Sequence, residues 1–351
     1  MSKRSRTSTW VRTFQRQIVA MTHLASAAGK HARAKAAPRV AARPGPAPEA
    51  GAWTPGVAFG ASGARRFRLY RPPGIKPGER LPLMVMLHGC GQDAEGFAAS
   101  TRMHHVALRE RFLVLYPEQD RLANAQGCWT WFDTDSGRAY DEVALIMKAI
   151  DQVCLLHPVN GTQVVVAGLS AGASMAALMV TQHPDRFRAL VMHSGVPPGT
   201  AHSALSALGA MQGQRSTLPL AASPSAMAAD WPPLLVIHGS ADAVVSPRNG
   251  QAAVQLWAQA AGAQSSAARS LQRGKRHPMS VTDFKSEGNT VSTLVEVQGL
   301  AHAWSGGADR QPFGDARGPD ASRMAWAFAA RQFNGLDDAC VAPEPRRATA
   351  R

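Results

Sequence analysis

The sequence VVVAGLSAGAS at residues 164–174 decides the fold, because it changes within a few positions from one structural pattern to another. Its first residues are β-branched and apolar, as in a buried strand, and its last residues open an Ala- and Met-rich pattern typical of a helix. The Gly-x-Ser-x-Gly between them is typical of a sharp strand-to-helix turn that lifts a serine hydroxyl above the edge of a sheet. Ser170 is therefore the first candidate nucleophile. The five-residue pattern also occurs by chance in ordinary loops, so the rest of the chain decides between the two interpretations.

Further apolar runs alternate with segments of helical spacing along the chain. The run at residues 81–87 is almost entirely apolar, which is typical of a strand buried on both faces. Similar runs follow at 112–117, 189–192 and 233–237, and a turn at 286–289 leads as a hairpin into an alternating strand at 289–297. Helical spacing covers residues 101–111, 141–156, 171–183, 251–261 and 321–333. The alternation predicts an α/β protein with a mostly parallel central sheet flanked by helices.

The length and composition of the chain predict one catalytic domain with extensions. With 351 residues, 45% of them hydrophobic, the chain is long enough to bury one large core. We place the catalytic domain at residues 53–335. Residues 199–230 are small, polar and interrupted by proline, which indicates an insertion or lid over one edge of the sheet. Residues 336–351 are charged and Pro-rich and are predicted to be a disordered tail.

The formal net charge of +14 belongs largely to a predicted flexible extension at residues 1–52. Its apolar Trp10, Phe14, Ile18 and Met21 fall at helical spacing, which favours an amphipathic cationic helix. Such a helix is suited to bind an anionic or granule surface, to make nonspecific contacts with phosphates, or to pack on the chain's own domain. The simpler alternative is a solvated basic extension. No specific nucleic-acid partner is predicted. The following basic residues precede the first acidic one: Lys3, Arg4, Arg6, Arg12, Arg16, Lys30, Arg33, Lys35, Arg39 and Arg43.

Targeting and cofactor signals are weak in this sequence. The apolar segment at residues 18–28 is interrupted by polar residues, so we favour a cytoplasmic, granule-associated location and keep secretion as the alternative. No apolar run approaches the roughly 20 residues that cross a bilayer.

The chain has 4 cysteines, which do not make a disulfide scaffold, although a single disulfide bridge stays possible. No Cys or His spacing matches a zinc site, so no metal and no cofactor are predicted.

An acid and a histidine follow Ser170 in a meaningful order. Asp242 comes directly after the buried strand at 233–237, and His302 lies in a Gly-rich loop after the strand at 289–297. This is the Ser, Asp, His order of α/β-hydrolases. A serine hydroxyl is a poor nucleophile at neutral pH, so an imidazole must take its proton, and an acid must orient that imidazole. The rival acids, Asp283, Asp315 and Asp320, do not follow a buried strand in this order, and the alternative for His302 is an ordinary loop histidine.

A developing oxyanion needs hydrogen-bond donors that are placed in advance. In this fold they are backbone amides, one after the nucleophile and one after an earlier strand, which predicts the amides of Ala171 and Cys90. The nearby His88 lacks partners at metal-ligand spacing and is expected to hold its loop. The aromatic segment CWTWF at residues 128–132 either packs over the sheet or lines a pocket. We take Trp129 and Trp304 as candidate substrate contacts.

Taken together, the motifs resemble the polyhydroxybutyrate depolymerase-like esterases of the α/β-hydrolase superfamily, close to feruloyl and acetylxylan esterases. The resemblance implies Ser170, Asp242 and His302 as a triad, places an oxyanion amide at Cys90, and brings Cys90 close enough to Cys128 to form a disulfide. Ala301 departs from the glycine that many relatives carry, and the basic extension has no counterpart. The matching segments are LHGCGQ (87–92), LYPEQ (115–119), CWTWF (128–132), AGLSAG (167–172), HSG (193–195), HGSAD (238–242) and GLAHAWSGG (299–307).

The resemblance implies a serine esterase that cleaves poly(3-hydroxybutyrate) or related short hydroxyalkanoate oligomers through an acyl-enzyme. Feruloyl or acetyl esters of plant polysaccharide are the alternative substrates, because one fold and triad serve many acyl groups. A non-catalytic granule-surface-binding protein is a third interpretation, which the complete triad disfavours. A basic extension that binds the granule surface is consistent with the first interpretation.

Overall fold

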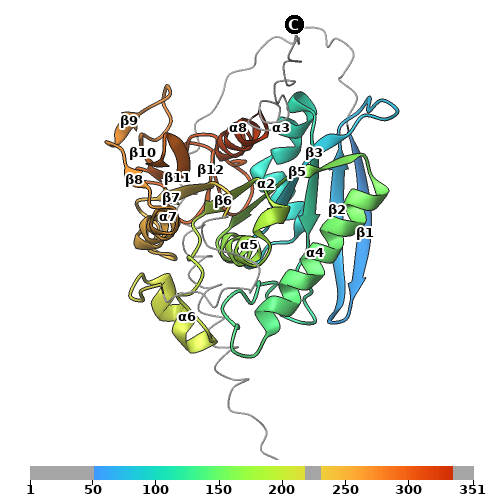
Figure 1. Cartoon of the computed structure of the whole chain (residues 1–351), viewed down its shortest axis with the longest axis horizontal. Coiled ribbons are helices and arrows are strands. Elements are labelled where there is room, and N and C mark those ends of the chain that lie inside the picture. Colours follow the sequence, from blue (N-terminus) through green and yellow to red (C-terminus); the bar gives the residue numbers. More distant parts are fainter. Residues whose placement is uncertain (1–50, 218–230, 335–351) are drawn as a thin grey trace, which may run out of the picture.

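The computed structural model describes residues 51–217 and 231–334, which are organised around one large sheet (Figure 1). The order of its strands is β1-β2-β4-β3-β5-β6-β7-β11-β10-β8, with β9 paired to β10. The strands are β1 (Ala52–Gly60), β2 (Gly63–Arg71), β3 (Leu81–Leu87), β4 (Leu113–Pro117), β5 (Val159–Leu169), β6 (Ala189–His193), β7 (Leu234–Gly239), β8 (Gln264–Ser265), β9 (Arg269–Leu271), β10 (Met279–Ser286) and β11 (Asn289–Val297). Two short strands, β12 (Trp304–Ser305) and β13 (Gly314–Asp315), form a separate pair.

The middle of the sheet is parallel and its two margins are antiparallel. Strands β4, β3, β5, β6, β7 and β11 pair in parallel, whereas β1 and β2 at one margin and β10 with β8 and β9 at the other are antiparallel. The helices are α2 (Ala94–Thr101), α3 (Met103–Glu110), α4 (Arg138–Leu156), α5 (Ala171–Gln182), α6 (Ala204–Met211), α7 (Arg248–Ala260) and α8 (Ala321–Asn334), with a 3-10 turn at Pro184–Arg186. The predicted α/β-hydrolase class with a mostly parallel, helix-flanked sheet is confirmed.

Both faces of the sheet are covered, which explains the continuous apolar runs in the sequence. In β3, Leu83, Val85 and Leu87 belong to the same core as the inner faces of α4, α5 and α7. The alternate residues Met84 and Met86 belong to the opposite core, with α2, α3 and α8. Figure 1 shows α4 crossing the near side of β1 and β2. Because all residues of β3 except the half-buried Pro82 are buried, alternation of polar and apolar residues is absent from this strand.

The predicted helix at residues 101–111 corresponds to α3, and a separate helix that was not predicted, α2, precedes it. Helix α2 begins after Asp93, whose side chain accepts a hydrogen bond from Gly96 N at 2.7 Å and caps the helix. Arg102 then takes a left-handed conformation with φ of 53° and separates α2 from α3. The hairpin predicted around residues 286–289 is confirmed, because Glu287 and Gly288 form a tight turn with φ of 50° and 82° between β10 and β11.

The predicted insertion at residues 199–230 contains a helix that the sequence pattern does not reveal. This helix, α6, starts with a capping box in which Ser203 and Ser206 bond each other's backbone amides. Residues 218–230 lie outside the described part of the chain, as do the predicted tail at 336–351 and nearly all of the predicted extension at 1–52. Among the described residues, no helix is long and apolar enough to span a membrane.

Candidate active site

The turn between β5 and α5 holds Ser170 in an unusual conformation. Its φ of 56° and ψ of −122° lie outside the regions that residues with a side chain favour. The flanking glycines make the turn feasible. A Cβ at Gly168 would collide with the backbone of Gly172, and a Cβ at Gly172 would collide with the carbonyls of Leu87 and His88. The turn is also tied to the next strand, because Ser170 N donates a hydrogen bond to the carbonyl of His193 at 2.8 Å.

Asp242 and His302 form a buried hydrogen-bonded pair. His302 Nδ1 donates to Asp242 Oδ2 at 2.8 Å, and the side chains are 2% and 0% exposed. The other carboxylate oxygen, Oδ1, accepts from the amides of Val244 and Val245, both at 2.9 Å. Burial opposes ionisation of Asp242, but the charge and the hydrogen bond of His302, together with the nearby His238, outweigh it and hold the pKa of Asp242 well below its ordinary value. The carboxylate is therefore ionised, fixes the Nδ1–H tautomer of His302 and leaves Nε2 to act as a base.

His238 is a second histidine that supports Asp242. Its Nε2 donates to the carbonyl of Val245 at 2.9 Å and lies 3.5 Å from Asp242 Oδ2. This hydrogen bond joins the end of β7 to the part of the loop that follows Asp242. His238 stands in the motif HGSAD, but its part in holding this loop is not visible from the sequence.

The sheet register brings the three predicted triad residues to the same edge. Leu169, His193, Ile237 and Val295 lie in one row across β5, β6, β7 and β11. Ser170, Asp242 and His302 all come after that row, where the parallel strands end. Among the described residues, Ser170 Oγ makes no hydrogen bond with His302. Catalytic hydrogen bonds are often long before substrate binds.

The two predicted oxyanion donors are available. In the described part of the chain, neither the amide of Cys90 nor that of Ala171 has an acceptor. Ala171 is the first residue of α5, so the positive end of the helix dipole points to the same place. Cys90 and Cys128 are joined by a disulfide with their Cα atoms 4.3 Å apart, so the proximity implied by the resemblance is present.

His88 fixes the loop that carries Cys90 through hydrogen bonds of both its ring nitrogens. Its Nδ1 donates to the carbonyl of Gly89 at 2.9 Å, and its Nε2 accepts from the amide of Gln119 at 3.1 Å. Burial lowers the pKa of His88 to about 4, so the ring is neutral as this bonding requires. Both ring nitrogens are occupied, and no group of three metal-ligating side chains exists among the described residues.

His193 connects the turn of Ser170 to the loop of His302. Its carbonyl accepts from Ser170 N, and its Nε2 accepts from the amide of Ser305 at 3.0 Å. Burial, and then the charges of His238 and His302, lower the pKa of His193 to about 3, so this ring is also neutral. The sequence motif HSG contains this residue without indicating that it joins two parts of the site.

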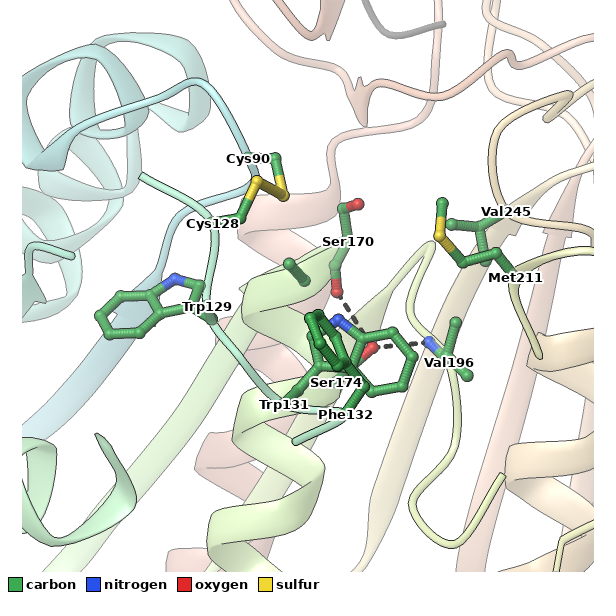
Figure 2. Close-up of a pocket in the computed structure, with 11 residues that line it drawn as sticks. Cys90, Cys128, Trp129, Trp131, Phe132, Ser170, Ser174, Val196, Met211 and Val245 are labelled. Atoms are coloured by element: carbon green, nitrogen blue, oxygen red, sulfur yellow. Dashed lines mark hydrogen bonds between the residues drawn. A yellow bond between two sulfur atoms is a disulfide. The ribbon is translucent and has the colours of Figure 1, made fainter. Parts of the chain in front are cut away.

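A small pocket opens beside Ser170 (Figure 2). The disulfide and Trp129 line one side, Trp131 and Phe132 line the next, and Val196, Met211 and Val245 line the side opposite the disulfide. No lining side chain is charged. The hydroxyl of Ser174 already makes two hydrogen bonds: it accepts from Val196 N at 2.8 Å and donates to the carbonyl of Ser170 at 3.3 Å.

The two tryptophans chosen from the sequence have different positions. Trp129 borders the pocket and donates its Nε1–H to the carbonyl of His88 at 2.9 Å. Trp304 is not among the residues that line this pocket, and its contact with substrate stays a prediction. It is fully buried, stacks on His193 with ring centroids 5.0 Å apart, and donates to Ser322 Oγ at 3.1 Å.

A buried polar network behind the disulfide was not predicted. Arg65 Nη1 donates to Gln119 Oε1, and Gln119 Nε2 in turn donates to Glu142 Oε1 and to the carbonyl of Cys128. Glu142 Oε2 accepts from the amide of Thr130 at 2.8 Å, and Arg65 lies over the ring of Trp129. Burial raises the pKa of Glu142, opposed by these hydrogen bonds and by the charge of Arg65. The network fixes the segment 128–132 from its inner side.

Comparisons with known proteins find related esterases. The family model described as esterase PHB depolymerase matches residues 65–274. Poly(3-hydroxyalkanoate) depolymerase C of Paucimonas lemoignei is 32% identical over 183 residues, which are 50% of this chain and 44% of that protein, so the chain spans less than half of that relative. Feruloyl esterase B of Neurospora crassa is 25% identical over 57% of this chain and 72% of that protein.

Among solved structures, the acetyl xylan esterase from Aspergillus awamori has a TM-score of 0.55 at 19% identity and covers 72% of this chain and 94% of its own. A thermostable esterase has a TM-score of 0.50 at 17% identity and covers 80% of this chain and 62% of its own. At these identities the two structures support the fold.

Proposed function

Because the chain belongs to the esterase PHB depolymerase family, whose model covers residues 65–274, we propose that it hydrolyses carboxylic esters with Ser170 as the nucleophile. The observation that carries the proposal is the buried pair in which Asp242 holds His302 at 2.8 Å, at the sheet edge where Ser170 stands. An ionised acid, an oriented imidazole and a serine on a strained turn are the parts that acyl transfer needs.

The proposed reaction has two halves. In the first, Ser170 Oγ attacks the ester carbonyl while His302 Nε2 takes the hydroxyl proton, and the amides of Cys90 and Ala171 hold the oxyanion. The C–O bond to the alcohol then breaks, and His302 returns the proton to the leaving alcohol. In the second half, His302 takes a proton from water, the resulting hydroxide attacks the acyl-serine, and Ser170 leaves with its proton restored.

For the substrate, we propose poly(3-hydroxybutyrate) or related short hydroxyalkanoate oligomers. The support is the 32% identical depolymerase and a pocket without charged side chains, which suits a neutral, compact acyl group. Feruloyl or acetyl esters are the second candidate. They are favoured by the feruloyl esterase above and by a probable acetylxylan esterase A of Aspergillus clavatus, 27% identical over 66% of its length.

An ester panel tests both proposals. We expect Ser170→Ala to lower kcat/KM by roughly 10³-fold or more, whereas Ser62→Ala, at an exposed serine on a distant turn, leaves it unchanged. Hydroxybutyrate oligomers, methyl ferulate and an acetyl ester are compared on the wild type. Retention of most turnover by Ser170→Ala would refute the mechanism. A preference for ferulate or acetate would replace the substrate assignment and leave the mechanism intact.

We also propose that the basic segment at residues 1–52, rather than the catalytic domain, contacts an anionic or granule surface. Its support is the run of basic residues before Glu49. Deletion of residues 1–45 should weaken sedimentation with isolated polyester granules and leave hydrolysis of soluble esters unchanged. Equal sedimentation of both forms would remove this proposal.

A further inference from the structure

The side of the pocket opposite the disulfide is formed by Val196, Met211 and Val245, which we call the α6 wall. Figure 2 shows Met211 and Val245 on one side of Ser170 and the disulfide on the other. Met211 is the last residue of α6 and is only 6% exposed. A long unbranched thioether in this position bounds the space that remains for a substrate chain.

The backbone of Met211 is held by hydrogen bonds, in addition to the packing of its buried side chain in the core. Its carbonyl accepts hydrogen bonds from Ser246 N at 2.8 Å and from Asn249 Nδ2 at 3.0 Å. Ser246 directly follows Val245, so α6 is fastened to the same loop that carries Asp242. Within the same segment, Arg215 Nε donates to the carbonyl of Thr200 at 3.0 Å and joins the residues before α6 to those after it. Because these hydrogen bonds do not involve the Met211 side chain, that side chain can be changed while they are kept.

The pocket belongs to the acyl side of the reaction. Both residues with oxyanion amides, Cys90 and Ala171, line it, whereas His302 does not. In acyl transfer the imidazole must reach the leaving alcohol, so the alcohol leaves on the His302 side. The group that occupies the pocket is therefore the chain attached to the carbonyl carbon.

From this arrangement we infer that Met211 determines the acyl chain length that the enzyme accepts, with Val245 as its neighbour in the same wall. The inference rests on the proposed esterase function and names the residue that limits the acyl group to short uncharged chains. A pocket discriminates roughly 10–200-fold per methylene that it cannot accommodate. Shortening Met211 to alanine removes three heavy atoms, so longer chains should gain access.

Two series of esters test the inference. In the first, the alcohol is constant, as p-nitrophenol, and the acyl group runs from acetate to butyrate, hexanoate and octanoate. In the second, the acyl group is butyrate and the alcohol varies from methyl to hexyl. For Met211→Ala we expect the ratio of kcat/KM for hexanoate to that for butyrate to rise about tenfold or more, with no change in the alcohol series. Met211→Phe should lower butyrate relative to acetate.

Matched variants separate this role from a general effect on folding. Leu205→Ala changes the same helix at a residue that is 79% exposed, and it should keep the wild-type profile. If Met211→Ala does not fold, Met211→Phe and Val245→Ala give the same test, and Val245→Ala should shift the acyl profile in the same direction by less.

The possible outcomes are distinct. A wild-type protein that cleaves none of these esters refutes the proposed function. A wild type that cleaves them while the folded Met211 and Val245 variants keep its acyl profile, or shift only the alcohol profile, refutes the role of Met211.

Discussion

The two sides of the pocket differ in how they are held. The disulfide side consists of Cys90, Cys128 and Trp129, and it is fixed by a covalent bond and by the buried network of Arg65 and Glu142. The α6 wall is apolar and depends on hydrogen bonds to the carbonyl of Met211. The first side carries a proposed oxyanion amide, whose position must be accurate to fractions of an ångström. The second only has to fit a substrate chain, so its side chains are free to differ without loss of chemistry.

The largest expected effect comes from Glu142. Glu142→Leu removes the buried carboxylate whose charge acts on the buried guanidinium of Arg65, and it leaves Gln119 Nε2 and the amide of Thr130 without this acceptor. We expect the free energy of unfolding to fall by about 3–5 kcal/mol, as when a buried charge loses the opposite charge that compensates it. Urea unfolding measures this change. The matched control is Glu95→Leu, which breaks an exposed pair with Arg68 and should change stability by at most about 1 kcal/mol. Similar losses of stability in Glu142→Leu and Glu95→Leu would contradict the distinction between the buried and the exposed acid.

Removal of the disulfide should be next in size. The bond closes a segment with a sequence separation of 38 residues. Replacing Cys90 and Cys128 by alanine should lower the free energy of unfolding by about 2–4 kcal/mol. It should also lower kcat about tenfold or more, because the amide of Cys90 loses its fixed position. KM for short esters should change little, and a fall in stability with unchanged kcat would show that the bond does not position the amide. Replacement of the free Cys154 by alanine is the control.

Lowering the pH should reduce the free energy of unfolding through protonation of His88, which holds the loop of Cys90 on the disulfide side. Its pKa in the folded protein is about 4, whereas an unfolded histidine titrates near 6.5. The unfolded chain therefore binds a proton first, so stability is complete above about pH 6.5 and falls as the pH drops toward 4. Between pH 6.5 and 5 this histidine should contribute a loss of about 2 kcal/mol. Urea unfolding of His88→Gln should show a shallower pH dependence than the wild type, whereas the exposed His105→Gln should not.

The smallest effect is expected at the anchor of the α6 wall. Asn249→Ala removes one of the hydrogen bonds to the Met211 carbonyl but leaves that of Ser246 N. The free energy of unfolding should fall by about 1 kcal/mol. The ratio of hexanoate to butyrate hydrolysis should change less than twofold, because the Met211 side chain is still present. A change as large as that of Met211→Ala would mean that the backbone anchor, not the side chain, sets the chain length.

The parts of the fold that were predictable have strong local patterns. Strand β3 coincides with the apolar run at 81–87, and the order of Ser170, Asp242 and His302 indicated the edge at which they lie. Strand β1 was missed because Pro55 and Gly56 interrupt it and its side chains alternate only weakly at the margin of the sheet. Helix α2 was missed because the glycine at its third position conceals its start.

The two sides of the pocket were harder to predict, for different reasons. Arg65 lies among basic residues in β2, a context typical of a solvated strand, yet it is 2% exposed. Its burial depends on Glu142 and Gln119, which are far away in the sequence. Met211 lies in a segment of small residues without a clear period, and only the contact with the loop after Asp242 shows its position. Long-range contacts of this kind leave no local signal in a single sequence.

The position of His302 after β11 has a consequence for biosynthesis. Strand β11 pairs with β7, and the loop that follows it brings His302 to Asp242, its partner from 60 residues earlier. Before that loop is made, the growing chain on the ribosome already contains Ser170 but lacks the imidazole that we propose to activate it. Ser170 and Asp242 are therefore synthesised before their proposed partner, and the proposed triad is completed only after the last parallel strand, β11, has been made.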